Sequence, residues 1–117
     1  MEICTLEQYY FNNLMTERLQ KLIEMNKKKE SDFLLFAIAK EYEADAQVEK
    51  ALDCYAQLVV KYPNYVGTYY HYASLLQEQD KKTEASSIIE RGIEICTIQG
   101  DRHAASELAF LLETEED

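Results

Sequence analysis

A shift of 34 residues aligns two neighbouring parts of this sequence. Small residues then coincide, since Ala39 meets Ala73 and Ala51 meets Ala85. A fixed period of this length is typical of chains that repeat one supersecondary unit, in which each unit buries its apolar face against the next. The sequence therefore favours a repeat fold over the alternative, an ordinary helical bundle in which the agreement arises by chance.

Each aligned part carries two apolar stripes with helical spacing. The first stripe of the first part consists of Leu35, Ile38, Ala39 and Tyr42, at i, i+3, i+4 and i+7. The second consists of Ala51, Tyr55 and Leu58. Pro63 ends this second helix because proline lacks the N–H donor and clashes with the preceding turn. Alternating strand patterns are absent, so we expect an all-α fold of antiparallel helix pairs.

A third unit is present only in part. A further shift of 36 residues places Ala105, Leu108, Ala109 and Leu112 on the pattern of a first helix. We therefore expect a turn about two residues longer before this helix, with Asp101 as its N-cap. Upstream, apolar spacing predicts a helix from about Thr5 to Met25, Ser31 or Asp32 can cap the next one, and Asn64 the one after.

These patterns divide the chain into four segments. We expect an N-terminal helical extension or cap at 1–30, a first repeat at 31–65, a second repeat at 66–99, and a C-terminal capping helix with an acidic tail at 100–117.

The repeat resembles the tetratricopeptide repeat, whose pattern of about 34 residues has a small residue in each helix and a proline near its end. The first unit matches this pattern well, although Leu35 replaces the family's frequent Trp and Ala39 its frequent Gly. The second unit departs from it at Gly92 and Thr97. The resemblance implies a short right-handed superhelix whose concave side is lined by the first helix of each pair.

Charge is unevenly distributed along the chain. The net charge is −10, and residues 31–117 carry all of it, because residues 1–30 hold five acidic and five basic side chains. A nucleic-acid surface needs clustered Lys and Arg, and an anionic membrane repels an acidic surface. We therefore expect neither partner. The three cysteines, Cys4, Cys54 and Cys96, are far apart and favour reduced thiols in a cytoplasmic protein.

The sequence offers no catalytic motif. A glycine-rich phosphate loop, a GxSxG elbow and an HExxH pair are all missing. A nucleophile pair of Cys54 and His71 would need an orienting group and an oxyanion hole that nothing supplies. Acidic pairs such as Glu41 with Asp45 are typical of solvated helix faces. We therefore expect no enzyme, no metal and no cofactor.

The first helices supply the candidate site. Once the core positions are assigned, the same helices turn another set of side chains toward the concave side. The candidate peptide-binding residues are Phe36, Lys40, Tyr70, His71, Ser74, Gln77, Ser106 and Phe110, with Glu43, Glu78, His103 and Glu113 alongside. Family members that clamp a carboxylate use Lys, Asn and Arg there, and only Lys40 fits, so a partner with apolar and basic side chains suits this site better.

The expected function is a non-catalytic adaptor that binds a peptide or protein segment in its concave groove. Aromatic side chains provide much contact area at low entropic cost, which is typical of interface anchors. The alternative is a homo-oligomerisation module, because so few repeats leave apolar surface at the ends of the stack, which residues 6–14 of a neighbour would cover.

Overall fold

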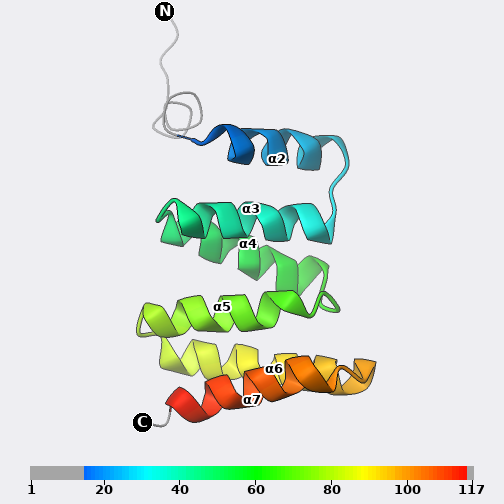
Figure 1. The fold of residues 1–117 in the computed structure, drawn as a ribbon, viewed down its shortest axis with the longest axis vertical. Helices are drawn as coiled ribbons and strands as arrows, with labels where there is room; N and C mark the ends of the chain where they lie inside the picture. Colours follow the sequence, from blue (N-terminus) through cyan, green and yellow to red (C-terminus); the bar gives the residue numbers. More distant parts are fainter. Residues whose placement is uncertain (1–14, 116–117) are drawn as a thin grey trace, which may run out of the picture.

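The computed structural model describes residues 15–115, and this part of the chain consists of helices without strands. The helices are α2 (Glu17–Lys28), α3 (Asp32–Ala44), α4 (Val48–Lys61), α5 (Gly67–Glu78), α6 (Lys82–Gln99) and α7 (Arg102–Glu115). They are stacked in chain order from α2 to α7, with α4 and α6 behind α3 and α5 in the view of Figure 1. The expected all-α helical-repeat fold is confirmed.

Within each complete helix pair, α3 with α4 and α5 with α6, the two helices are joined by the same type of turn. Ala46 and Asp80, which are 34 positions apart, both adopt the left-handed conformation, with φ of 58° and 59°. In each turn an amide reaches back to a carbonyl of the preceding helix: Gln47 N to Tyr42 O at 2.8 Å, and Lys81 N to Leu76 O at 2.9 Å. The repeat is therefore present in the backbone as well as in the side-chain pattern.

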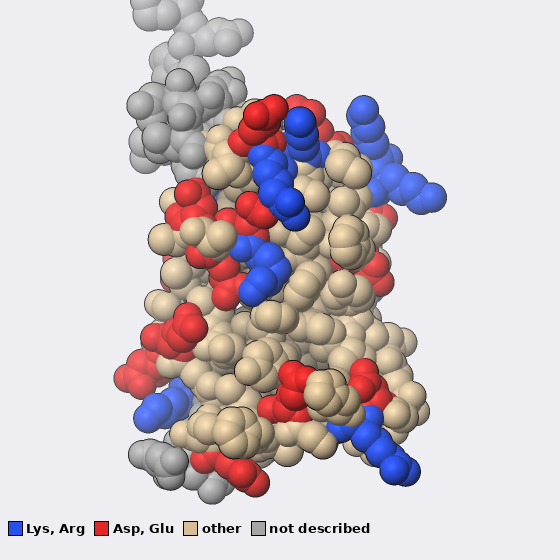
Figure 2. Space-filling view, viewed as in Figure 1, with Lys and Arg blue, Asp and Glu red and all other residues tan. Residues whose placement is uncertain are grey.

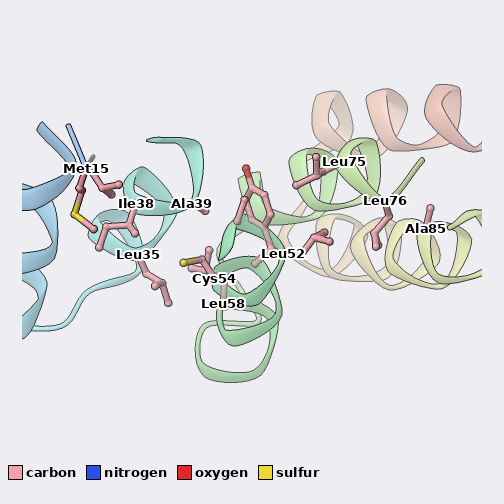
Figure 3. Packing of buried hydrophobic residues seen from close by; sticks show 13 residues of the cluster. Met15, Leu35, Ile38, Ala39, Leu52, Cys54, Leu58, Leu75, Leu76 and Ala85 are labelled. Atoms are coloured by element: carbon pink, nitrogen blue, oxygen red, sulfur yellow. The ribbon is translucent and has the colours of Figure 1, made fainter. Parts of the chain in front are cut away.

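Small residues lie where helices approach one another closely. Ala39, Ala51, Ala73 and Ala85 are all fully buried, as the repeat pattern predicts. An alanine at a helix contact lets the two backbones come together, and larger neighbours fill the surrounding space. Figure 3 shows this packing around Ala39 and Ala85, with leucine side chains from several helices pointing into the core.

Gly92 departs from the repeat pattern for a reason that the packing explains. A methyl group there would lie 2.6 Å from Cβ of Tyr69 and 2.8 Å from Cδ1 of Leu108. In the first repeat, Leu58 occupies the matching position and Leu35 stands where Tyr69 stands. In the second repeat the larger side chain is therefore on α5 and the smaller on α6. Tyr69 is fully buried and leaves no room for a side chain at position 92.

Two expectations are wrong: the continuity of the first helix and the cap of α5. A continuous helix from Thr5 is interrupted, since Met15 and Thr16 are not helical and Thr16 caps α2 by accepting a hydrogen bond from Leu19 N. Its earlier residues lie outside the described part of the chain. Asn64 does not cap α5, which begins at Gly67 without a side-chain cap. A backbone hydrogen bond from Tyr65 N to Tyr62 O, at 3.0 Å, closes the turn instead.

Other expected caps are correct. Ser31 accepts a hydrogen bond from Leu34 N at 3.0 Å, and Asp101 Oδ1 accepts one from Ala104 N at 3.1 Å. Helix α2 ends at Lys28, inside the basic run that suits a helix C-terminus.

The longer turn expected before α7 is also wrong, because the additional residues extend α6. Thr97 replaces the proline of the first repeat and does not stop the helix, so α6 has 18 residues where α4 has 14. Gly100 then ends α6 in the left-handed conformation, with φ of 76°. On α7, Ala109 is exposed and Leu111 is buried, because no helix follows in the described chain to cover the face on which Ala109 lies.

The buried side chains form two clusters along the stack. One extends from Met15 and from Leu19 on α2 to Ala85 on α6, and the other joins α5, α6 and α7 around Tyr69 and Leu108. Cys54 belongs to the first and Cys96 to the second, and both thiols are free. Burial raises the pKa of Cys54 to about 11, so this thiol is a poor nucleophile. Cys4 lies outside the described residues.

Candidate binding face

Aromatic rings from α3 and α5 meet on the face formed by the first helix of each pair. The ring of His71 lies edge-on to Phe36, with 5.3 Å between the ring centroids, and edge-on to Tyr70 at 5.7 Å. Phe36 is half-buried, whereas Tyr70 is 37% exposed. His71 therefore links a partly covered aromatic ring to one that faces solvent.

Lys40 joins this cluster by polar contacts. Its Nζ lies 3.1 Å from His71 Nδ1 and 3.2 Å from Glu43 Oε2. The same carboxylate oxygen accepts a hydrogen bond from Tyr55 at 2.5 Å. Because an ammonium group can only donate, His71 Nδ1 accepts this bond and the imidazole proton is on Nε2. Glu43 thus connects the surface group Lys40 to the buried Tyr55.

The environment of His71 favours its neutral form. Burial of the ring lowers the pKa of His71 below its usual value, and the charge of Lys40 lowers it further. Glu43 and Glu107 act in the opposite direction. Because Glu107 lies on α7, this helix also contributes to the electrostatic environment of His71. At neutral pH His71 therefore presents an N–H donor rather than a cation.

Two residues of this cluster were missed by the sequence analysis. Tyr65 packs against Phe36, with ring centroids 5.4 Å apart. Gly67 is exposed beside both rings, and a Cβ there would lie 3.8 Å from Tyr65 and 3.9 Å from Phe36. Both lie in or next to the turn after Pro63, outside the periodic helical pattern. The repeat alignment contains one signal for them, because Gly67 stands where the first repeat has the large residue Phe33.

The remaining candidates lie further along the same helices. Gln77 donates from Nε2 to Leu111 O at 3.1 Å, so it ties α5 to α7. Ser74 is half-buried, and Ser106 is exposed on α7. Phe110 is 67% exposed. The structure thus brings Phe36, Lys40, Tyr70 and His71 together, uses Gln77 in helix packing, and leaves the two α7 residues open to solvent.

Figure 2 shows the charge distribution on the side of the molecule where α3, α5 and α7 lie nearest the viewer. Blue Lys and Arg side chains are more frequent toward the α2 end, red Asp and Glu side chains occur in both halves, and uncharged surface is extensive between them.

Surface depressions elsewhere are lined by other residues. One of about 460 Å³ lies between α2 and α4 and includes Ile23 and Cys54, and one of about 300 Å³ lies beside Gly100. Residues 15–115 contain no group of three or more side chains that could hold a metal ion. Within the same residues, every helix is too short or too polar to cross a bilayer.

Comparison with known proteins shows which solved structures share this fold. No protein-family model matches the chain, and no curated protein sequence matches it. The crystal structure of a tetratricopeptide repeat domain protein from Salinibacter ruber is 32% identical, with a TM-score of 0.71 over 74% of this chain and 97% of that one. A solution structure of a tetratricopeptide repeat domain protein from the same organism gives 0.72, over 74% and 88%. A Bordetella parapertussis protein shares the fold at 23% identity and a TM-score of 0.73, over 86% and 88%.

The chain is thus a helical-repeat protein built from stacked antiparallel pairs. It belongs to the tetratricopeptide repeat family, since it is 32% identical to a Salinibacter ruber member whose chain it covers almost completely. Proteins with this fold generally mediate protein–protein interaction and are typically non-catalytic. The resemblance recognised in the sequence is confirmed.

Proposed function

We propose that this protein is a non-catalytic interaction module that binds a peptide or protein segment along the face formed by α3, α5 and α7. The observation that carries the proposal is the ring cluster of Phe36, His71 and Tyr70, which leaves Tyr70 37% exposed while one side of it is held by His71. A half-exposed aromatic ring that is already held in place loses little entropy when a partner covers it.

Polar groups beside the rings can orient the bound segment by donating hydrogen bonds to it. Lys40 uses two of its three donors on Glu43 and His71, which leaves one N–H for a carbonyl of the partner. The Nε2–H of His71 is a second donor. In this mechanism the partner's apolar side chains lie against Tyr70 and the exposed part of Phe36, and its backbone accepts from Lys40 and His71.

The test is a peptide selection with matched variants. A displayed library of random twelve-residue peptides is selected against the full chain, and the affinities of the selected peptides are measured by calorimetry. Tyr70→Ala should weaken their binding by about 1–3 kcal/mol, as expected for an interface anchor. Val60→Ala, at a position 80% exposed on α4, is the control and should leave the affinity unchanged. Peptides that bind both variants as tightly as the wild type would refute the proposed face.

Self-association remains a second candidate because of the uncovered end of α7. Ala109 and Phe110 are both exposed there, and apolar surface at the end of a repeat stack can pair with another copy. Light scattering over a range of concentrations decides between the two functions. A constant monomer mass supports the adaptor, and a mass that rises with concentration and falls again in Phe110→Ala supports assembly.

A further inference from the structure

Phe110 stands exposed between two carboxylates on α7. Its side chain is 67% exposed. Glu107 lies three residues before it and Glu113 three residues after it, and residues three apart on a helix are neighbours with about 5–6 Å between their Cβ atoms. Glu113 is exposed. Glu107 is paired with a basic side chain of the same helix, since its Oε1 lies 2.5 Å from His103 Nε2. One helix surface therefore presents an aromatic ring with an acid on either side.

This combination suits one kind of side chain. The face of an aromatic ring attracts a cation, and the long stems of Lys and Arg pack against apolar surface while their heads reach a polar group. A Lys or Arg placed over Phe110 would bury ring surface and bring its charge to Glu107 or Glu113. An acidic side chain would cover the same ring but meet two like charges.

The ring lies within reach of the Tyr70 cluster. Helices α5 and α7 pack directly on one another and are tied by the hydrogen bond from Gln77 to Leu111 O. Packed helices have axes about 8–10 Å apart. Because Gln77 meets Leu111, Phe110 is level with the second half of α5, about 9 Å along the helix from Tyr70 at 1.5 Å per residue. An extended segment advances about 3.3 Å per residue, so it spans the resulting diagonal of about 13 Å in about four residues.

The charge of the protein favours a basic partner over an acidic one at this face. Lys40, the basic candidate residue of the face, is held by Glu43 and His71 on the α3 side. The whole chain carries a net charge of −10. A field of this sign raises the local concentration of basic partners and repels acidic ones.

From these features we infer that the partner is a basic segment that places a Lys or Arg over Phe110, between Glu107 and Glu113, and an apolar side chain about four residues away against Tyr70. The inference rests on the proposed function, because it names the chemistry of the segment that binds the same face.

The experiment uses the random twelve-residue library selected against the full chain. The expected enrichment is an apolar residue with Lys or Arg about four positions away. For the selected peptides, Glu113→Lys should lower the affinity about fivefold or more, and Phe110→Ala about tenfold. Glu90→Lys is the matched control, since Glu90 is exposed on α6 and the variant changes the net charge equally. It should change the affinity by less than about twofold at 0.15 M salt.

The outcomes separate this inference from the proposed function. Peptides that need Tyr70 but show no preference for Lys or Arg, or bind Glu113→Lys as well as wild type, overturn the basic partner and leave the interaction module standing. Selected peptides that are indifferent to Tyr70→Ala overturn both. A wild-type mass that doubles with concentration, and does not double in Phe110→Ala, means that a second copy covers Phe110, which also overturns the inference.

Discussion

Gly92 offers the sharpest test of how the second repeat is packed. In Gly92→Ala the new methyl carbon would lie 2.6 Å from Tyr69 Cβ, whereas carbon atoms in contact are about 3.5–4.0 Å apart. Tyr69 Cβ is attached to the backbone of α5, so it cannot turn away. Helices α5 and α6 must therefore separate locally by about 1 Å, which loosens the buried cluster around them.

The expected loss of stability follows from two opposing effects. Inserting a methylene into a filled core costs about 1–3 kcal/mol, and the upper end applies because the obstructing atom is tied to a helix backbone. Replacing a helical glycine by alanine returns about 1 kcal/mol of helix propensity. The net effect is a destabilisation of about 2 kcal/mol, which corresponds to a fall in melting temperature of about 8 °C for a domain of this size.

Gly67→Ala is the matched control. Position 67 is exposed at the start of α5, and the nearest atoms to a new Cβ lie at 3.8 and 3.9 Å, which is an ordinary contact distance. This variant should be neutral or more stable by about 0.5 kcal/mol. Urea unfolding followed by circular dichroism measures both variants. A Gly92→Ala protein as stable as Gly67→Ala would show that the close approach of α5 and α6 is not what excludes a side chain from position 92.

Two further predictions concern single polar groups. Thr68 is fully buried and its hydroxyl finds no hydrogen-bond partner among residues 15–115, so Thr68→Val should stabilise the fold by about 1 kcal/mol in urea unfolding, whereas Thr68→Ser, which keeps the hydroxyl, should not. Burial and Lys40 lower the pKa of His71 below its usual value of 6.5, so the unfolded state takes up the proton more readily. The contribution of His71 to stability is therefore present above pH 6.5 and decreases as the pH falls below it. The drop in urea midpoint between pH 7.5 and pH 5.5 should therefore be smaller in His71→Asn, and an equal drop in both proteins would contradict this assignment.

The repeat pattern predicted the fold because it fixes which side chains are buried. Ala39 and Ala73 are fully buried at matching positions, as the shift of 34 residues requires. The same pattern could not predict where the connections lie. The start of α5 depends on hydrogen bonds within the turn after Pro63, and the length of α6 depends on the loss of a proline at Thr97. Such local effects interrupt the periodicity on which the prediction was based.

The binding face shows the same division. The pattern placed Phe36, Tyr70 and His71 on one face because the helical period fixes the direction of each side chain relative to the core stripe of its helix. The contact from Lys40 to His71 depends on the side-chain rotamers of two helices and on the proton position of the imidazole, neither of which a sequence pattern encodes. Tyr65 was missed because it lies in a turn, where spacing gives no direction.

The division of the core into two clusters has a consequence for how this chain acquires its structure. Helix α2 contributes to one cluster and α7 to the other, and Ile88 packs against both. Contacts therefore connect segments that are close in sequence, and the entropy of closing long loops is small, which favours rapid folding that spreads from one pair to the next. In hydrogen exchange, amides of α2 and α7 should open first, while the amides of α5 and α6, where the clusters meet, should exchange last.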